Sequence, residues 1–233
     1  MAQNTSSAVM QQRVEPHTSL DDFPTPPWAT RAACEWVAGQ MAADPDLSFL
    51  SDMVVREPCA NRGHMVRPLI EFFGDVDALD VHDYGVGFRV EDYLLGHDSE
   101  AVDWTFMNPP FRLAAQFIAR ALRSSRHGVA VFVRSAFAES VGRYLDLFSK
   151  TPPSAILQFS ERVVLHKGRL VDPDVKLRVW SKKEGKFVWR LPSTATAYCW
   201  MIWDLNAATS GTSYHWIAPC RQRLTRLGDY DVC

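Results

Sequence analysis

A tetrapeptide at the end of an apolar run has the residue types best suited to chemistry. Asn108-Pro109-Pro110-Phe111 follows Val102–Met107, which has the composition of a buried strand. Proline has a fixed φ and no N–H, so two prolines end the strand and stiffen the turn. Such a turn can direct the Asn108 side-chain carbonyl and the Pro109 main-chain carbonyl to one point. There they would accept both N–H groups of a planar amine such as that of adenine. The alternative interpretation is that residues 108–111 only end the strand in a turn and place Phe111 in the core.

Three acidic residues are expected at or near the carboxyl ends of strands. Glu57 follows the apolar run 53–55, Asp80 lies at the end of 76–81, and Asp92 lies within 88–93. In doubly wound sheets, ligands bind at such strand ends, where the strand order switches. Asp80 fits an acid that accepts hydrogen bonds from ribose hydroxyls. The alternative interpretation is that the three residues are ordinary acids at strand ends and bind no ligand.

The loop after the first strand, residues 57–63, contains a single glycine, Gly63. One glycine makes a poor cradle for a pyrophosphate, which a Gly-x-Gly-x-x-Gly turn would bind. An acid such as Glu57 in this loop disfavours a phosphate and favours a cationic amino group. A ligand with a ribose, a positive group and no phosphate is therefore predicted, and S-adenosylmethionine has these properties.

The charge of the chain is unevenly distributed. The net charge is −2, but residues 162–190 contain nine Lys or Arg residues and three acids, a net charge of +6. A basic segment on an acidic body is typical of a phosphate-binding surface, and a solvated hairpin is the alternative. The segment lies between two expected sheet strands, which predicts an inserted hairpin. The candidate phosphate contacts are Lys167, Arg169, Lys176, Arg178, Lys182 and Lys183. Trp180 and Trp189 are interpreted as hairpin core rather than as wedges between bases.

Composition sets the broad class of the protein. Of 233 residues, 47% are hydrophobic and 12% aromatic, which is typical of a globular domain. There is no apolar run of membrane-spanning length, and the polar first twenty residues do not resemble a signal peptide. Five scattered cysteines without Cys-x-x-Cys or zinc spacing favour a reduced, cytoplasmic protein without a metal. A homodimer is compatible with the sequence.

Alternating strands and helices predict an α/β fold with a mostly parallel, seven-stranded sheet and helices on both faces. Strands are expected near 53–55, 76–81, 88–93, 102–107, 128–133, 155–159 and 197–203. Helices are expected near 28–41, 64–73, 113–122 and 138–148. We predict a disordered N-terminal tail at 1–21, one domain at 22–220 with the hairpin 162–190 inserted in it, and a C-terminal tail at 221–233.

The chain resembles the class I amino-methyltransferases that modify adenine in DNA, including small enzymes of phages and prophages. The resemblance covers most of residues 23–160 and returns at 197–203. The tetrapeptide 108–111 is similar to that family's Asp/Asn/Ser-Pro-Pro-aromatic catalytic motif. Residues 57–63 are similar to its cofactor loop, without the middle glycine, and residues 23–27 to the segment that closes over the methionine end of the cofactor. The resemblance implies a Rossmann-like fold and S-adenosylmethionine contacts from Thr25, Pro26, Glu57, Pro58, Gly63, Asp80, Asp92 and Asn108.

The same resemblance implies a mechanism. Hydrogen bonds from adenine N6–H to Asn108 and Pro109 would favour a pyramidal nitrogen, whose lone pair then attacks the sulfonium methyl. The base would leave double-stranded DNA and stack on Phe111. Arg134 and Ser135 are further candidates for the substrate cleft. Cytosine N4, an RNA base or a protein glutamine is an alternative acceptor, and a nucleic-acid-binding module without catalysis is a second alternative.

Overall fold

The computed structural model describes residues 21–42, 49–96, 100–181, 183–207 and 211–230. The predicted N-terminal tail therefore lies outside the described residues, apart from Asp21. Lys182, a predicted phosphate contact, also lies outside them.

Within the described residues, eight strands form one sheet in the order β10-β6-β9-β5-β4-β1-β2-β3. The strands are β1 (Val54–Glu57), β2 (Asp75–Asp80), β3 (Arg89–Val90), β4 (Val102–Met107), β5 (Ser125–Arg134), β6 (Ala155–Phe159), β9 (Tyr198–Asp204) and β10 (Ser213–Ile217). Only β9 is antiparallel to its neighbours among these pairings. The α/β fold with a mostly parallel sheet is thus confirmed, with one strand more than the seven predicted. The additional strand, β10, lies at the edge, where its largely exposed residues lack the apolar run that marks buried strands.

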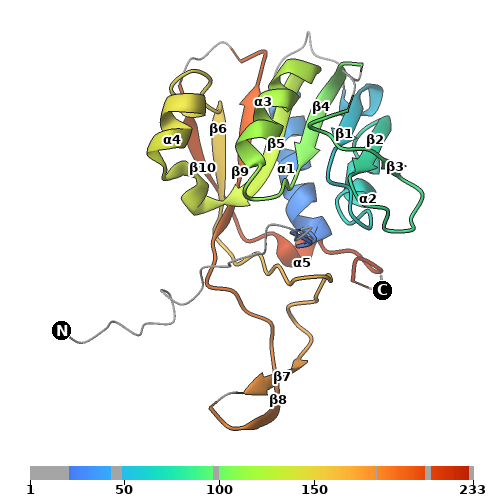
Figure 1. Ribbon diagram of the computed structural model, residues 1–233, viewed down its shortest axis with the longest axis vertical. Helices are drawn as coiled ribbons and strands as arrows, with labels where there is room; N and C mark the ends of the chain where they lie inside the picture. Colours follow the sequence, from blue (N-terminus) through green and yellow to red (C-terminus); the bar gives the residue numbers. More distant parts are fainter. Residues whose placement is uncertain (1–20, 43–48, 97–99, 182, 208–210, 231–233) are drawn as a thin grey trace, which may run out of the picture.

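Helices cover both faces of the sheet (Figure 1). The α-helices are α1 (Pro27–Met41), α2 (Val66–Ile70), α3 (Ala114–Ser124), α4 (Val141–Arg143) and α5 (Arg221–Leu224). Shorter turns are the 3-10 helices η1 (Leu50–Asp52) and η2 (Ser135–Ala138) and the π-helical turn η3 (Tyr144–Phe148). The predicted helix 138–148 is therefore present over 141–148, where α4 continues directly into the π-helical turn η3.

Two hydrophobic clusters show how the faces are filled. One joins α1, α2 and α5 to one side of the sheet, and the other joins α3 and η3 to the opposite side. In β9, Trp200 belongs to the first cluster and the adjacent Met201 to the second. Because successive side chains of a strand point to opposite faces, a strand covered on both sides is apolar throughout. This explains the unbroken apolar runs in β5 and β9.

The strand order places the carboxyl ends of β1, β2 and β4 together. The chain passes from β1 outward to β2 and β3, and then crosses to β4 on the other side of β1. All of these strands are parallel, so Glu57, Asp80 and the residues after Met107 lie at the same edge of the sheet. This is the switch point at which doubly wound sheets bind ligands.

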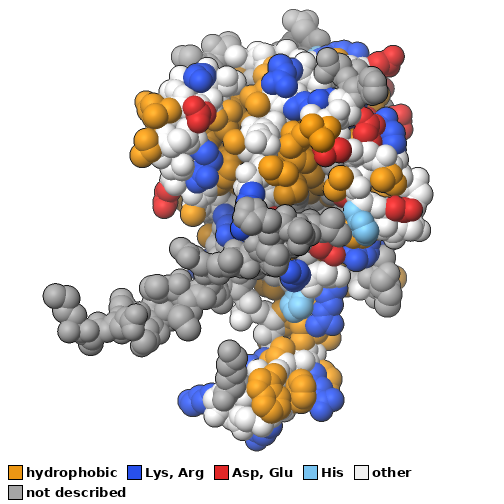
Figure 2. Space-filling view, viewed as in Figure 1, with side chains coloured by type: hydrophobic (Ala, Val, Ile, Leu, Met, Phe, Trp, Pro, Cys, Tyr) orange, Lys and Arg blue, Asp and Glu red, His pale blue; other side chains and the backbone are white. Residues whose placement is uncertain are grey.

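Residues 160–197 form an insertion at this same edge. β6 is antiparallel to β9, which is antiparallel to β5, so the insertion leaves and returns at the carboxyl end of the sheet. Within it, β7 (Leu177–Ser181) and β8 (Lys186–Arg190) form a separate antiparallel two-stranded sheet. This hairpin projects away from the body of the molecule (Figures 1 and 2).

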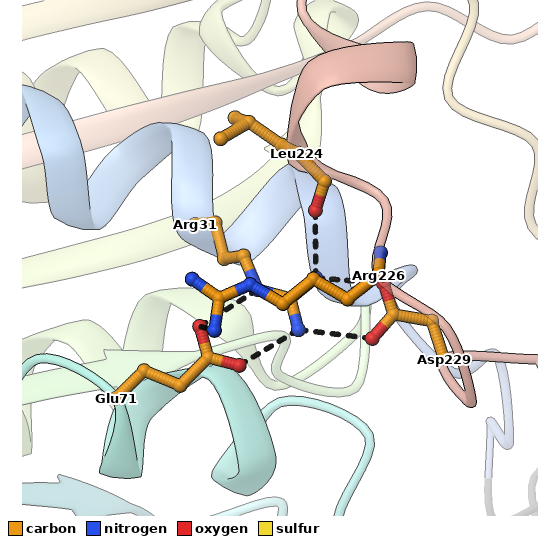
Figure 3. A network of polar contacts seen from close by, with 5 residues as sticks. All are labelled: Arg31, Glu71, Leu224, Arg226 and Asp229. Atoms are coloured by element: carbon orange, nitrogen blue, oxygen red, sulfur yellow. Dashed lines mark hydrogen bonds and ion pairs between the residues drawn. The ribbon is translucent and has the colours of Figure 1, made fainter.

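Residues 221–230, expected to be part of a C-terminal tail, instead pack against α1. The side chain of Leu224 is buried in the cluster with α1, and Arg31 hydrogen-bonds the Leu224 carbonyl at 2.7 Å. The buried Arg31 guanidinium also donates to Asp229 at 2.7 and 2.9 Å and to Glu71 at 2.8 Å (Figure 3). One cation on α1 thus holds the C-terminal segment and the end of α2 together. The short helix and polar composition of 221–230 gave no local signal of this non-local attachment.

Replacing Arg31 with methionine is expected to lower the free energy of unfolding by about 3–5 kcal/mol, because the buried Asp229 carboxylate loses its cationic partner. Glu71 is more exposed and keeps its ion pair with Arg226. Denaturant unfolding of the purified protein measures this loss. Arg223→Ala is the control, because its ion pair with Glu35 is exposed and contributes little. Equal stability of the Arg31→Met variant and the wild type would contradict a clamp at this position.

Candidate active site

A pocket of about 170 Å³ lies at the carboxyl ends of β1, β2 and β4, beneath the segment that precedes α1. The predicted cofactor and catalytic residues that line it are Thr25, Glu57, Pro58, Asp80, Asp92, Asn108 and Pro110. The other predicted residues, Pro26, Gly63, Pro109 and Phe111, are not part of the lining. Side chains that are far apart in the sequence therefore meet in one concave site.

The orientation of the Asn108 side chain is defined by one hydrogen bond. Its Nδ2 donates to the main-chain carbonyl of Phe23 at 2.9 Å. A carbonyl can only accept, so the amide nitrogen must face Phe23 and Oδ1 must point the other way. Within the described part of the chain, Oδ1 makes no hydrogen bond. Asn108 therefore keeps an acceptor for a ligand while its donor is used by the protein.

A second hydrogen bond attaches the segment before α1 to the loop 108–111. The Phe111 N–H donates to Asp21 Oδ2 at 2.7 Å. Asp21 has φ of +51°, a left-handed conformation that Asp tolerates better than most residues. Residues 21–25 thus lie across the loop 108–111 and hold it at two points.

The Glu57 carboxyl is buried and lacks the hydrogen bonds that would offset the cost of its burial. Both of its oxygens lack a hydrogen-bond partner among the described residues. Burial raises the pKa of Glu57 well above its usual value, and the Asp80 carboxylate raises it further. The Cys59 backbone N–H acts in the opposite direction, but less strongly. An isolated buried carboxyl is costly, so this group fits a ligand that supplies a cation with several N–H donors.

Asp80 is held more firmly than Glu57. Its two oxygens accept hydrogen bonds from the backbone N–H groups of Asn61, at 2.9 Å, and His82, at 3.0 Å. Burial raises the pKa of Asp80, and these hydrogen bonds oppose that rise. Each carboxylate oxygen can accept more than one hydrogen bond, so the oriented group can still receive ligand hydroxyls.

The loop after β1 forms its turn with one glycine because Asn61 takes the backbone conformation that a second glycine would otherwise provide. Asn61 has φ of +50°, the left-handed conformation that a glycine would otherwise provide. Its side chain donates to Asp22 Oδ1 at 2.7 Å and accepts from the Arg62 N–H at 2.7 Å. Gly63 has φ of +81°, and a Cβ there would lie 3.0 Å from the Phe88 ring. Gly63 thus shapes the loop without lining the pocket.

His64 is a lining residue that the sequence analysis missed. It is 3% exposed, and its Nδ1 has no partner among the described residues. Thr25, also 3% exposed, presents a similarly unpartnered Oγ1 to the same pocket. Burial lowers the pKa of His64 to about 4, and Arg67 and Arg62 lower it further. The position directly after Gly63 in a ligand loop was the only available signal.

Apolar and aromatic side chains complete the pocket walls. The lining residues of this kind that were given no role in advance include Met65, Val81, Tyr84, Tyr93, Leu94, Leu113 and Phe117. Asp92 Oδ1 accepts the Leu94 N–H at 2.8 Å, so Asp92 orders the turn that carries two of them. Such surfaces suit the flat ring of a heterocycle. From sequence, these residues could not be distinguished from core residues.

Phe111 lies beside the pocket, and the guanidinium of Arg134 lies over its ring. The Arg134 guanidinium carbon is 4.1 Å from the Phe111 ring centroid, and the Arg134 Nε is buried without a partner in the described structure. Phe23 packs on the same ring at a centroid distance of 6.3 Å. Ser135, by contrast, donates to Gln158 of β6 at 2.7 Å. Of the two cleft candidates, Arg134 is the one with a contact to Phe111 of the predicted catalytic motif.

The predicted phosphate contacts lie in the insertion at the carboxyl edge of the sheet, and those described are Lys167, Arg169, Lys176, Arg178 and Lys183. Trp180 and Trp189 were expected in the hairpin core, and this was wrong. They are 55% and 66% exposed, because a two-stranded hairpin has no second layer to cover a face.

Within the described residues, no group of three or more His, Cys, Asp or Glu side chains is arranged to hold a metal ion. No helix among these residues has the length and apolar character needed to cross a membrane.

Replacing His64 with asparagine is expected to reduce the loss of stability in mild acid. The native pKa of about 4 lies below the usual value of 6.5. Between these values the unfolded chain binds a proton that the folded chain does not, so wild-type stability falls as the pH falls. From pH 7 to pH 5 this contribution amounts to about 2 kcal/mol, which the variant would not lose. Denaturant unfolding at both pH values tests this, with exposed His166→Asn as a control that should behave like the wild type.

The comparisons with known proteins concern the fold. No family model matches the chain, and no curated protein matches it. A Listeria monocytogenes structure described as a class I S-adenosylmethionine-dependent methyltransferase is 10% identical, with a TM-score of 0.58, and the match covers 90% of this chain and 70% of that one. A Vibrio vulnificus structure described as a modification subunit of a type I restriction enzyme is 15% identical, with a TM-score of 0.53. That match covers 90% of this chain and 51% of the other, so the chain spans about half of its length. The chain therefore has a Rossmann-like class I methyltransferase fold.

Proposed function

We propose that this protein transfers a methyl group from S-adenosylmethionine to the exocyclic N6 amine of adenine in DNA. The observation that carries the proposal is the Asn108 side chain. Its amide nitrogen donates to the Phe23 carbonyl, which leaves Oδ1 as an acceptor, and Asn108 lines the pocket at the end of β4. An acceptor held in this way suits an N–H donor of a planar amine.

The pocket residues fit the proposed cofactor. The uncompensated Glu57 carboxyl suits the cationic amino group, and the oriented Asp80 carboxylate suits the ribose hydroxyls. The unpartnered Thr25 hydroxyl is available to the methionine carboxylate. Tyr93 and Leu94, on the turn ordered by Asp92, offer a flat apolar wall for the adenine ring. When bound, S-adenosylmethionine supplies an electrophilic methyl group on a sulfonium sulfur.

The protein's part in the reaction is then to orient the amine. Asn108 Oδ1 and the Pro109 carbonyl accept the two N6–H groups, which favours a pyramidal nitrogen with an available lone pair. Phe111 offers a ring on which a base flipped out of the helix can stack. Arg134 already covers one face of that ring, so stacking requires the opposite face or displacement of Arg134.

We propose duplex DNA as the substrate. A nucleic acid, rather than a protein, is supported by the charge of the insertion. Its basic residues project from the same edge of the sheet as the pocket, where they can hold the phosphates on either side of a target base. A protein glutamine would not require this charge. We further propose that the enzyme acts in the cytoplasm of a bacterial or phage-infected cell.

Methyl transfer can be tested directly. The purified protein is incubated with methyl-labelled S-adenosylmethionine and plasmid DNA from a host without DNA methylation, and the DNA is digested to nucleosides. We expect label in N6-methyl-2′-deoxyadenosine, and at least about 100-fold less of it with the Asn108→Ala variant. Label in 4-methylcytosine, or only in RNA or protein supplied in parallel, would refute the choice of adenine in DNA.

A further inference from the structure

One face of the β7–β8 hairpin carries three aromatic rings. Trp180 pairs with Phe187, and Arg178 pairs with Trp189. Directly opposed residues of a two-stranded sheet share a face, and residues two apart in a strand share it as well. These four residues therefore form one surface, which we call the aromatic face.

The rings of the aromatic face are open to solvent. Trp180 and Phe187 are each 55% exposed, and Trp189 is 66% exposed. Trp180 and Phe187 pack edge to face at 5.2 Å, and the Arg178 guanidinium lies 4.6 Å from the Phe187 ring. The rings are thus already ordered against each other. An exposed cluster of this kind on a soluble protein marks an interaction site.

The charge around the aromatic face indicates the kind of partner. Lys176 precedes β7 and Lys183 lies in the turn, and both are exposed without an ion pair in the described structure. Lys186 and Arg190 share Glu184, at 3.6 and 2.9 Å. Figure 2 shows hydrophobic side chains on this hairpin with Lys and Arg side chains around them. Rings between cations suit a chain of bases and phosphates.

The chemistry of the face favours unpaired bases over a paired duplex. Reading a groove requires polar side chains directed at base edges. Apart from Arg178 and the indole N–H groups, this face offers ring surface, which matches the flat faces of bases. A duplex hides those faces in its stack, whereas a single strand exposes them.

We propose that the aromatic face is a stacking surface for unpaired bases of single-stranded nucleic acid, with the flanking lysines holding its backbone. The proposal rests on the proposed function only in taking nucleic acid as the partner. It goes further by naming a second contact surface, away from the pocket, that prefers an unpaired strand.

The test measures binding of the full-length protein to fluorescent oligonucleotides by anisotropy, without cofactor. The probes are a mixed-sequence single strand, the same sequence as a duplex, and a strand of equal length in which abasic sites replace the bases. We expect the single strand to bind more tightly than both others, since the abasic strand keeps the phosphates and loses the stacking. Equal affinity for the ordinary and abasic strands would overturn the proposal.

The double variant Trp180→Leu/Trp189→Leu keeps apolar residues in both strands and removes two rings. We expect its single-strand affinity to fall at least about tenfold, with little change for the duplex. Val179→Ala, on the opposite face of the hairpin, is the matched control and should bind like the wild type. Unchanged single-strand binding by the double variant, or no binding to any probe by the wild type, would overturn the proposal, and the latter would point to a protein partner.

This test is separate from that of the methyl transfer. Binding is measured without cofactor, and label transfer to plasmid DNA is measured on its own. Single-strand binding without methyl transfer would support the stacking surface and refute the proposed function. Methyl transfer without tighter single-strand binding would support the proposed function and refute the stacking surface.

Discussion

The Asn108→Ala variant is expected to lose methyl transfer by at least about 100-fold while binding S-adenosylmethionine within a few-fold of the wild type. The alanine removes the only side-chain acceptor that we assign to the target amine, and groups of this kind contribute about 10²–10³ in rate. The cofactor contacts from Glu57 and Asp80 are independent of it. Transfer is measured with labelled cofactor, and binding by calorimetry.

Asn108→Asp separates the two functions of this side chain. The carboxylate keeps an acceptor for the amine but cannot donate to the Phe23 carbonyl, which the native Nδ2 does at 2.9 Å. We expect activity between that of the wild type and that of the alanine variant. Loss of cofactor binding in Asn108→Ala would instead assign Asn108 to the cofactor and contradict the role proposed here.

The Glu57→Gln variant is expected to bind S-adenosylmethionine at least about tenfold more weakly than the wild type. In the absence of S-adenosylmethionine, the variant is nevertheless expected to be more stable than the wild type. Glutamine removes the negative charge that the buried carboxyl would carry without a hydrogen-bond partner in the described structure, and relief of such a buried unpaired group amounts to about 1–3 kcal/mol. Calorimetry gives the affinity, and denaturant unfolding gives the stability.

The stability difference between the wild type and Glu57→Gln is expected to depend on pH in a definite direction. The pKa of Glu57 is raised in the folded protein, so the folded state holds the proton above pH 4.5, where the unfolded state releases it. Wild-type stability is therefore lost, relative to the variant, as the pH rises from about 4.5 through the native pKa of Glu57. Exposed Glu139→Gln should change neither affinity nor stability. A variant that is less stable than the wild type at neutral pH would show that Glu57 is a structural residue.

Much of the fold could be predicted because its signals are local. Continuous apolar runs such as 128–133 and 197–203 occur where β5 and β9 are covered on both faces. The helix expected near 28–41 is α1, which begins at Pro27 and ends at Met41. The acids that follow such runs could likewise be placed at one edge, because parallel strands end on the same side. β10 escaped prediction because an exposed edge strand lacks that signal.

The sequence by itself determined the alternation of strands and helices, the residue types at the strand ends and the excess of cations in one segment, since each is a property of neighbouring residues. Only the tertiary structure decided which polar groups have partners. It leaves Glu57, Thr25 and His64 unpartnered in one pocket, directs the Asn108 amide toward Phe23, and exposes Trp180 and Trp189. The physical reason is that hydrogen bonding and burial depend on segments far apart in the chain, such as residues 21–25 and the loop after β4, and no local pattern contains that information.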